Sequence, residues 1–180
     1  MKKLILTSAI AIMTAGTALA HEYKVGDLVI DHPVARATPA NAPVSAGYMT
    51  ITNNGSEDDT LIAATAPFSA NVELHEMAMD GDVMKMREID GGIVIPAGES
   101  VKLMPGGLHV MFMGMQQQLN EGETYEGTLT FENAGTINVT LNVESLTQIR
   151  EAMGGKAMDH SGHDHPGHKH SDGDHSGHNH

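Results

Sequence analysis

The sequence predicts an all-β sandwich or barrel, and three observations lead to it. Short apolar runs follow one another at nearly regular spacing between residues 21 and 149. Turn-forming groups of Gly, Asn, Asp and Pro separate these runs, and no part of the region has a convincing helical period. Many short strands joined by frequent turns are typical of sandwiches and barrels. The length is sufficient for one hydrophobic core, so residues 21–150 are expected to form a single domain.

The expected elements follow from the apolar runs and the turns that end them. The run at 28–30 is followed by Asp31-His32-Pro33, and the run at 48–52 ends at Asn53-Asn54-Gly55, which is a strong turn signal. Residues 145–153 are expected to form a short terminal helix. Further strands are predicted at 60–66, 72–79, 84–89, 92–95, 101–104, 108–112, 124–131 and 137–143.

Residues 1–20 have the pattern of a secretory signal peptide. Lys2 and Lys3 precede a mostly apolar stretch, and Ala18-Leu19-Ala20 fits the small-residue cleavage rule. The apolar stretch is shorter than the ~20 residues that a membrane-spanning helix needs, so we expect an exported, periplasmic protein without a membrane span. Cleavage would leave His21 at the N-terminus and change the formal charge from −13 to −15, because it removes two Lys and no acid.

Residues 151–180 are expected to form a flexible tail that binds metal. There is almost nothing to bury from Gly154 onward, and three of the four pentads in 161–180 match x-G-H-x-H. Such a segment has too little apolar surface to offset its chain entropy. The pattern argues against a purification tag, because tags run His consecutively and here Gly, Asp and Asn interrupt the His residues. The expected Cu(II) ligands are His160, His163, His165, His168, His170, His175, His178 and His180.

Composition excludes several function classes. The chain has no Cys, which excludes disulfides, thiolate zinc sites, iron–sulfur clusters and blue-copper centres. Its formal charge of −13 argues against a nucleic-acid partner. Met and His are in surplus, with 13 and 12 residues, and both residue types bind soft or borderline metals.

Soft ligands concentrate in two predicted strands. Side chains alternate between the faces of a strand, so His75, Met77 and Met79 share one face of the first strand. His109, Met111 and Met113 share a face of the second strand, while Leu108, Val110 and Phe112 point to the core. A turn at Asp80-Gly81-Asp82 would bring Met86 back toward His75. If the second strand lies nearby, His75, Met86, His109 and Met111 can converge. Thioethers and imidazoles suit Cu(I), and a neutral ligand set fits a monovalent ion. The competing interpretation is that the Met residues fill gaps in the core.

This pattern resembles the PCu(A)C-type periplasmic copper chaperones. The resemblance covers roughly residues 21–147 and is carried by His75-x10-Met86 followed by His109-x-Met111. The 22 residues between Met86 and His109 are about one more than is typical of the family. Ala46-Gly47-Tyr48, Pro96-Ala97-Gly98 and Pro105-Gly106-Gly107 also match.

The resemblance implies a cupredoxin-like Greek-key sandwich that is not an enzyme. It implies Cu(I) bound at an exposed site by His75, Met86, His109 and Met111. It also implies delivery to the binuclear copper centre of cytochrome c oxidase subunit II, or to another periplasmic copper protein. Residues 153–180 look like the His- and Met-rich extension of some members, which can take Cu(II). We expect a monomer.

Three other functions compete with delivery. In a copper enzyme, the amine and imidazole of His21 would chelate Cu(II) with a further His. His32, His75 and His109 are the candidates for it in the domain. Electron transfer is disfavoured because the cupredoxin redox site uses a Cys thiolate. In copper or zinc buffering for tolerance, the tail would be the main functional part and no specific recipient would exist.

Overall fold

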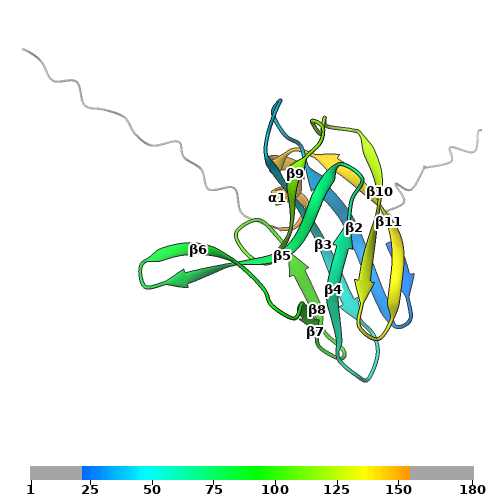
Figure 1. Cartoon of the computed structure of the whole chain (residues 1–180). Coiled ribbons are helices and arrows are strands. Elements are labelled where there is room, and N and C mark those ends of the chain that lie inside the picture. The colour runs from blue at the N-terminus through cyan, green and yellow to red at the C-terminus, as the bar shows by residue number, and fades with distance from the viewer. Residues whose placement is uncertain (1–21, 155–180) are drawn as a thin grey trace, which may run out of the picture.

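The computed structural model describes residues 22–154 (Figure 1). Residues 1–21, with the predicted signal peptide and His21, and residues 155–180, with the eight predicted His ligands, lie outside the described residues. Eleven strands and one helix make up the described part: β1 Glu22–Val25, β2 Leu28–Arg36, β3 Val44–Asn53, β4 Asp59–Thr65, β5 Ser69–Asp80, β6 Val83–Glu88, β7 Ile93–Ile95, β8 Ser100–Leu103, β9 His109–Met115, β10 Thr124–Phe131, β11 Gly135–Glu144 and α1 Leu146–Ala152.

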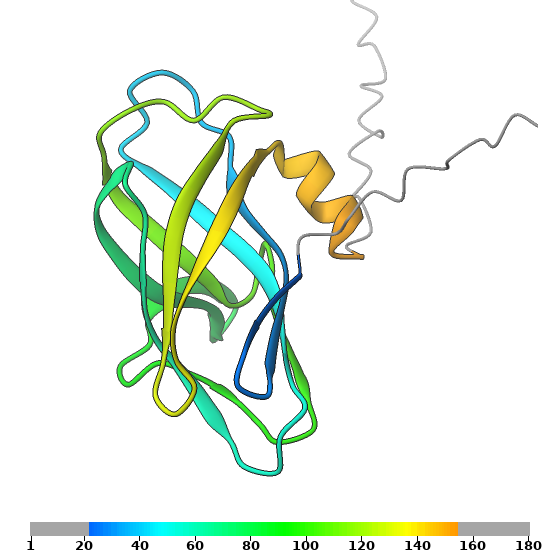
Figure 2. The same cartoon turned by 90° about the vertical axis from the view of Figure 1, so that its right-hand side faces the viewer.

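The strands form one hydrogen-bonded sheet that folds over itself into two layers, as Figures 1 and 2 show. The strand order is β6-β5-β9-β3-β2-β11-β10-β4-β7, with β1 added to β2 and β8 added to β3. The parallel β2–β11 pair joins the layer of β5, β9 and β3 to the layer of β10, β4 and β7. The predicted β-sandwich is therefore confirmed, and each predicted run lies within or largely overlaps a strand.

Alternating apolar side chains of the two layers face each other and build the core. Ile51 of β3 and Phe112 of β9 belong to the same buried cluster as Leu129 and Phe131 of β10, and all four are nearly inaccessible to water. Because alternate residues of a strand point to opposite faces, each strand leaves its other set of side chains outside this core. On β9 the outside set begins with His109 and Met111.

A second, smaller apolar cluster covers the outer face of β2 and β3. The helix α1 begins with a capping box in which Ser145 and Gln148 bond reciprocally, as expected for a helix that starts at this Ser. It packs Ile149 and Met153 against Val34 and Tyr48. The helix predicted over 145–153 is thus confirmed, and it lies beside the strand that neighbours β9.

The β5–β6 hairpin projects from the sandwich (Figure 1). Its turn contains Gly81 with a φ of 64°, a left-handed conformation that favours glycine. All six residues of β6 are exposed, and β6 pairs with β5 alone, at the edge of the sheet. The strand β5, which carries His75 and Met77, is therefore paired with the sandwich through β9 up to His75. Beyond His75 it pairs only with β6.

Gly47 allows β3 and β9 to approach closely beside His109. A Cβ atom at position 47 would lie 2.9 Å from Cε2 of Phe112, whose ring is buried. We expect Gly47→Ala to lower the free energy of unfolding by about 1–3 kcal/mol, the usual cost of overpacking a core. Urea denaturation of the metal-free protein measures it. An unchanged midpoint would mean that Phe112 can move without cost.

Candidate metal centre

The pairing of β5 with β9 brings the two domain imidazoles together. His75 and His109 are directly opposite each other in the antiparallel register. Their ring centroids are 5.8 Å apart, with an angle of 61° between the ring planes. Opposite residues of a strand pair project from the same face of the sheet, so both rings lie on the face that points away from the main core.

The two candidate thioethers lie on the same face. Met111 follows His109 by two residues on β9 and is opposite Glu73 of β5. Met86 of β6 is opposite Met77, which is two residues from His75 on β5. The four candidate donors therefore lie on one face of three adjacent strands, β6, β5 and β9, and Met77 lies on the same face. These donors are His75, Met86, His109 and Met111. We call these four residues the inner donor set.

His109 is oriented by the backbone. Its Nδ1 lies 3.0 Å from the carbonyl oxygen of Gly107. A carbonyl can only accept, so Nδ1 carries the proton and donates it, and the lone pair of the neutral ring is on Nε2. The side chain is only 4% exposed, and this burial lowers the pKa of His109 below its usual 6.5. A neutral imidazole with one nitrogen fixed by a hydrogen bond is the form that ligates metals.

His75 is oriented by a carboxylate. Its Nε2 donates to Oε2 of Glu73 at a distance of 2.8 Å. Nδ1 then holds the lone pair of the neutral ring, and this atom is buried without a hydrogen-bond partner. Buried polar atoms are almost always paired, so an orphaned acceptor beside a second imidazole fits a site that a metal ion completes. The contact with Glu73 is the outer-shell arrangement that fixes many metal-ligating His.

A cavity of about 510 Å³ opens beside these donors. Met77, Met86, His109 and Met111 line it together with Tyr48, whose ring centroid is 6.5 Å from that of His109. Burial raises the pKa of Tyr48, and the positive charges of Arg36 and Arg150 oppose that increase. Met86, His109 and Met111 are therefore reachable from outside through this cavity, and Met86 itself is 48% exposed.

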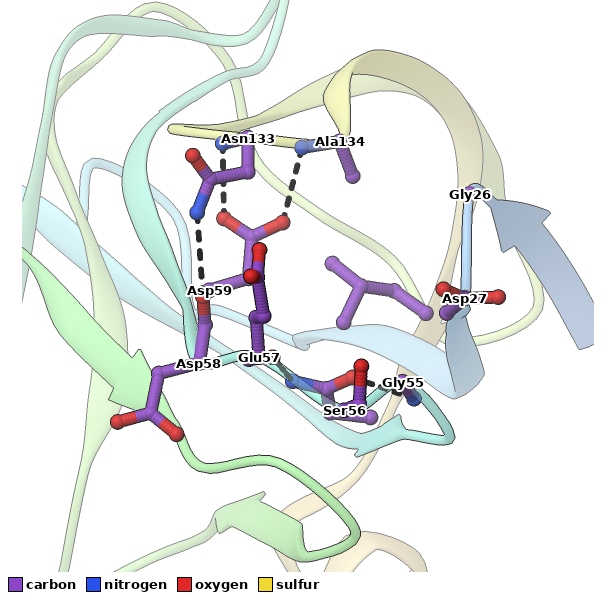
Figure 3. Close-up of a pocket in the computed structure, with 11 residues that line it drawn as sticks. Gly26, Asp27, Gly55, Ser56, Glu57, Asp58, Asp59, Asn133 and Ala134 are labelled. Atoms are coloured by element: carbon purple, nitrogen blue, oxygen red, sulfur yellow. Dashed lines mark hydrogen bonds between the residues drawn. The ribbon is translucent and has the colours of Figure 1, made fainter.

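Within residues 22–154, no three side chains of His, Asp or Glu gather in a metal-binding arrangement. The acidic hollow drawn in Figure 3, of about 280 Å³, is lined by Asp27, Glu57 and Asp58. The one buried carboxylate there, Asp59, accepts hydrogen bonds from the backbone of Asn133 and Ala134. Its role is to hold the β10–β11 turn against the start of β4. Over the same residues, no helix has the length and apolar character that crossing a membrane would require.

Sequence reasoning did not identify Glu73 or Tyr48, and it placed Met77 on the face of His75 without including it in the ligand set. Glu73 precedes His75 by two residues, so strand alternation could have identified it. Tyr48 reaches His109 through the β3–β9 pairing and has no local signal. His32 lies away from this register, with its Nε2 3.2 Å from Glu144.

Burial of His109 predicts a pH dependence of stability. The folded state favours the neutral ring, so the unfolded chain takes up this proton first as the pH falls. Stability should therefore decrease below about pH 6.5 until the folded pKa is passed, with a slope of at most about 1.4 kcal/mol per pH unit. Urea unfolding of the metal-free protein at several pH values measures it. His109→Asn should flatten the slope and His32→Asn should not; equal slopes in all three would contradict the prediction.

The fold and the cluster of side chains define a class of protein, namely β-sandwiches that carry imidazole and thioether groups close together near one edge of the sheet. The sequence profile described as "Putative lipoprotein LpqE-like" matches residues 28–143, and the chain belongs to this family. A relative from Leifsonia xyli subsp. xyli, described as "Putative lipoprotein Lxx21020", is 30% identical over 112 residues. These residues are 62% of this chain and 68% of that protein.

Solved structures agree with this assignment. The copper-bound PCuAC domain from PmoF2 has a TM-score of 0.61 and 30% identity, covering 69% of this chain and 98% of that one. The solution structure of Cu(I)-bound DR1885 from Deinococcus radiodurans has a TM-score of 0.55 and 29% identity, covering 73% and 85%. The PCuAC resemblance drawn from the sequence is thereby confirmed.

Proposed function

We propose that this protein is a periplasmic copper chaperone rather than an enzyme. It binds Cu(I) through the inner donor set and delivers it to the binuclear copper centre of cytochrome c oxidase subunit II. One observation carries the proposal: two imidazoles and two thioethers project from one face of three adjacent strands, and three of the four, Met86, His109 and Met111, line an open cavity. Two similar structures, the PmoF2 domain and DR1885, contain copper or Cu(I).

The chemistry of the donors supports Cu(I) in particular. Thioethers are soft ligands that are poorly suited to Zn(II), Mg(II) or Ca(II), and the set is neutral, as a monovalent ion favours. The orphaned Nδ1 of His75 and the free Nε2 of His109 supply the two nitrogen donors. Thioethers do not titrate, so the pH dependence of binding comes from the imidazoles.

The proposal divides the chain into residues 1–20 as signal peptide, 21–150 as copper domain and 151–180 as metal-binding tail. The tail binds Cu(II) through its imidazoles. The family description names a lipoprotein, which supports export. The formal charge of −15 after cleavage favours a recipient with a basic patch and a salt-sensitive encounter.

Copper transfer tests the proposal. The mature protein carrying one Cu(I) is mixed, without oxygen, with the reduced metal-free soluble domain of oxidase subunit II. Copper on each protein is then measured after separation. We expect copper to move to the acceptor, because its Cys thiolates are softer and negatively charged.

Met113→Leu is the matched control, since Met113 lies on the same strand outside the inner donor set and should not affect transfer. Met111→Leu should strongly weaken Cu(I) loading of the inner donor set and with it transfer. Copper that stays wholly on this protein would overturn delivery and favour buffering, in which the His-rich tail is the main functional part.

A further inference from the structure

The projecting β5–β6 hairpin has two chemically different faces. One face carries ion pairs: Nε of Arg87 lies 2.6 Å from Oε1 of Glu76, and Lys85 pairs with Asp80. The other face carries four methionines in two directly opposed pairs, Met77 with Met86 and Met79 with Met84. We call these four residues the thioether face. The inner donor set uses only Met86 from it.

Core packing does not explain these methionines. Met79 is 62% exposed, Met84 53% and Met86 48%. Together with Val83, they account for four of the seven large apolar side chains that the described residues expose. A methionine that fills a core gap is buried, whereas an exposed apolar group of this size usually marks a binding site.

The register brings the sulfurs within reach of one ion. Opposite residues in an antiparallel pair have Cβ atoms about 4.5–5.5 Å apart, and the next pair on the same face follows about 7 Å along the strands. Because methionine has three flexible torsions, Met79 and Met84 can close on an ion with Met77 as a third ligand. The thioether face continues through Met77 and Met86 into the inner donor set without interruption.

Nearby charge favours a cation over an apolar partner. Glu88 is opposite His75 on the same face of the hairpin, and Asp82 lies in the turn. Carboxylates around an uncharged sulfur cluster raise the local concentration of cations.

We infer that Met79 and Met84, with Met77, form a second site for a soft monovalent cation such as Cu(I) or Ag(I). This site receives the ion at the tip of the hairpin. The ion then moves inward by ligand exchange, with a bond to Met86 forming as a bond to Met79 or Met84 breaks, and its oxidation state does not change. The inward direction rests on the proposed function; the binding of a soft cation at the tip does not.

Methionine-methyl NMR tests the second site directly. The mature full-length protein, labelled with ¹³C at the methionine methyl groups, is titrated with Ag(I), which needs no reductant. The tip of the hairpin is tested at about pH 5.5, where imidazoles with the reference pKa of ~6.5 are mostly protonated, so competition from the tail is reduced while thioethers are unaffected. The inner donor set includes two imidazoles, so its response is tested in a parallel titration at about pH 7.5. We expect the first equivalent to shift the methyls of Met86 and Met111, and the second to shift those of Met77, Met79 and Met84.

The double variant Met79→Leu/Met84→Leu keeps the exposed apolar surface and removes only the sulfurs. It should retain the first-equivalent shifts and lose the second-equivalent shift of Met77. Met113→Leu, the matched control, should retain both. Met111→Leu should weaken the inner site and leave the shifts of Met79 and Met84 in place.

The outcomes separate the two proposals. If the methyls of Met79 and Met84 stay still through several equivalents while Met86 and Met111 respond, the second site is wrong and the proposed function stands. If Met79 and Met84 respond while Met86 and Met111 do not, the tip site stands and the inner donor set is wrong. If none of the four responds, both proposals fail, and an apolar docking role for the hairpin becomes the better explanation.

Discussion

Replacing Met111 by leucine is expected to weaken Cu(I) binding by more than the ~10–100-fold that loss of an outer-shell partner costs a metal site. The substitution conserves volume, so the fold should lose less than about 1.5 kcal/mol. The residues opposite Met111 are Glu73 on β5 and Ala46 on β3, and neither has a soft donor to replace the missing sulfur. Competition with a Cu(I) chelator gives the affinity, and urea denaturation checks the fold.

Met86 provides the internal comparison. Its opposite residue, Met77, lines the same cavity, so Met86→Leu should weaken Cu(I) binding less than Met111→Leu. Met77→Leu/Met86→Leu should then match the Met111 variant. Equal losses for the two single variants would show that Met77 cannot take over, and wild-type affinity in both would remove the thioethers from the site.

Removing the tail after Gly154 is expected to remove Cu(II) binding by the tail and to leave Cu(I) binding by the domain in place. Eight of the twelve His are lost, so the Cu(II) stoichiometry at pH 7.5 should drop sharply. Cu(I) binding and the urea midpoint should hardly change, because α1 ends at Ala152 and the last buried apolar residue of the described chain is Met153. Equilibrium dialysis with metal analysis measures both ions.

The pH dependence identifies the ligands of the tail. In the full chain, Cu(II) binding should fall below about pH 6, because imidazoles with a reference pKa near 6.5 must be neutral to ligate. A Cu(II) stoichiometry that survives truncation would place those ions on the domain, with the N-terminal His21 as the first residue to test.

Much of the fold could be predicted because the local signals agree with one another. Leu129 and Phe131 alternate with polar residues, and turn residues follow them. These patterns predict where each strand lies and which of its side chains face the core, without knowledge of the tertiary structure. Strand β1 has no such signal: its side chains are exposed or half-buried, and it is held by its pairing with β2.

The site was predictable only in part, for a physical reason. Strand alternation is a local property, and it placed the ligand side chains of each strand on one face. The pairing of β5 with β9 and the cavity beside them depend on contacts between distant segments. Tyr48 and Arg150, which line that cavity from β3 and α1, are 102 positions apart, and no pattern within either segment indicates that they meet.

The solitary position of β6 has a mechanical consequence for the proposed site. His75, His109 and Met111 stand on strands anchored in the sandwich, whereas Met86 stands on a ribbon that is tied to the body only through β5. Segments with few buried contacts open at the least cost in free energy. Swinging the ribbon outward would therefore strip one ligand from the ion without disturbing the core. The ion would remain on a rigid three-ligand platform with a vacant side, to which an acceptor could attach before the old bonds break.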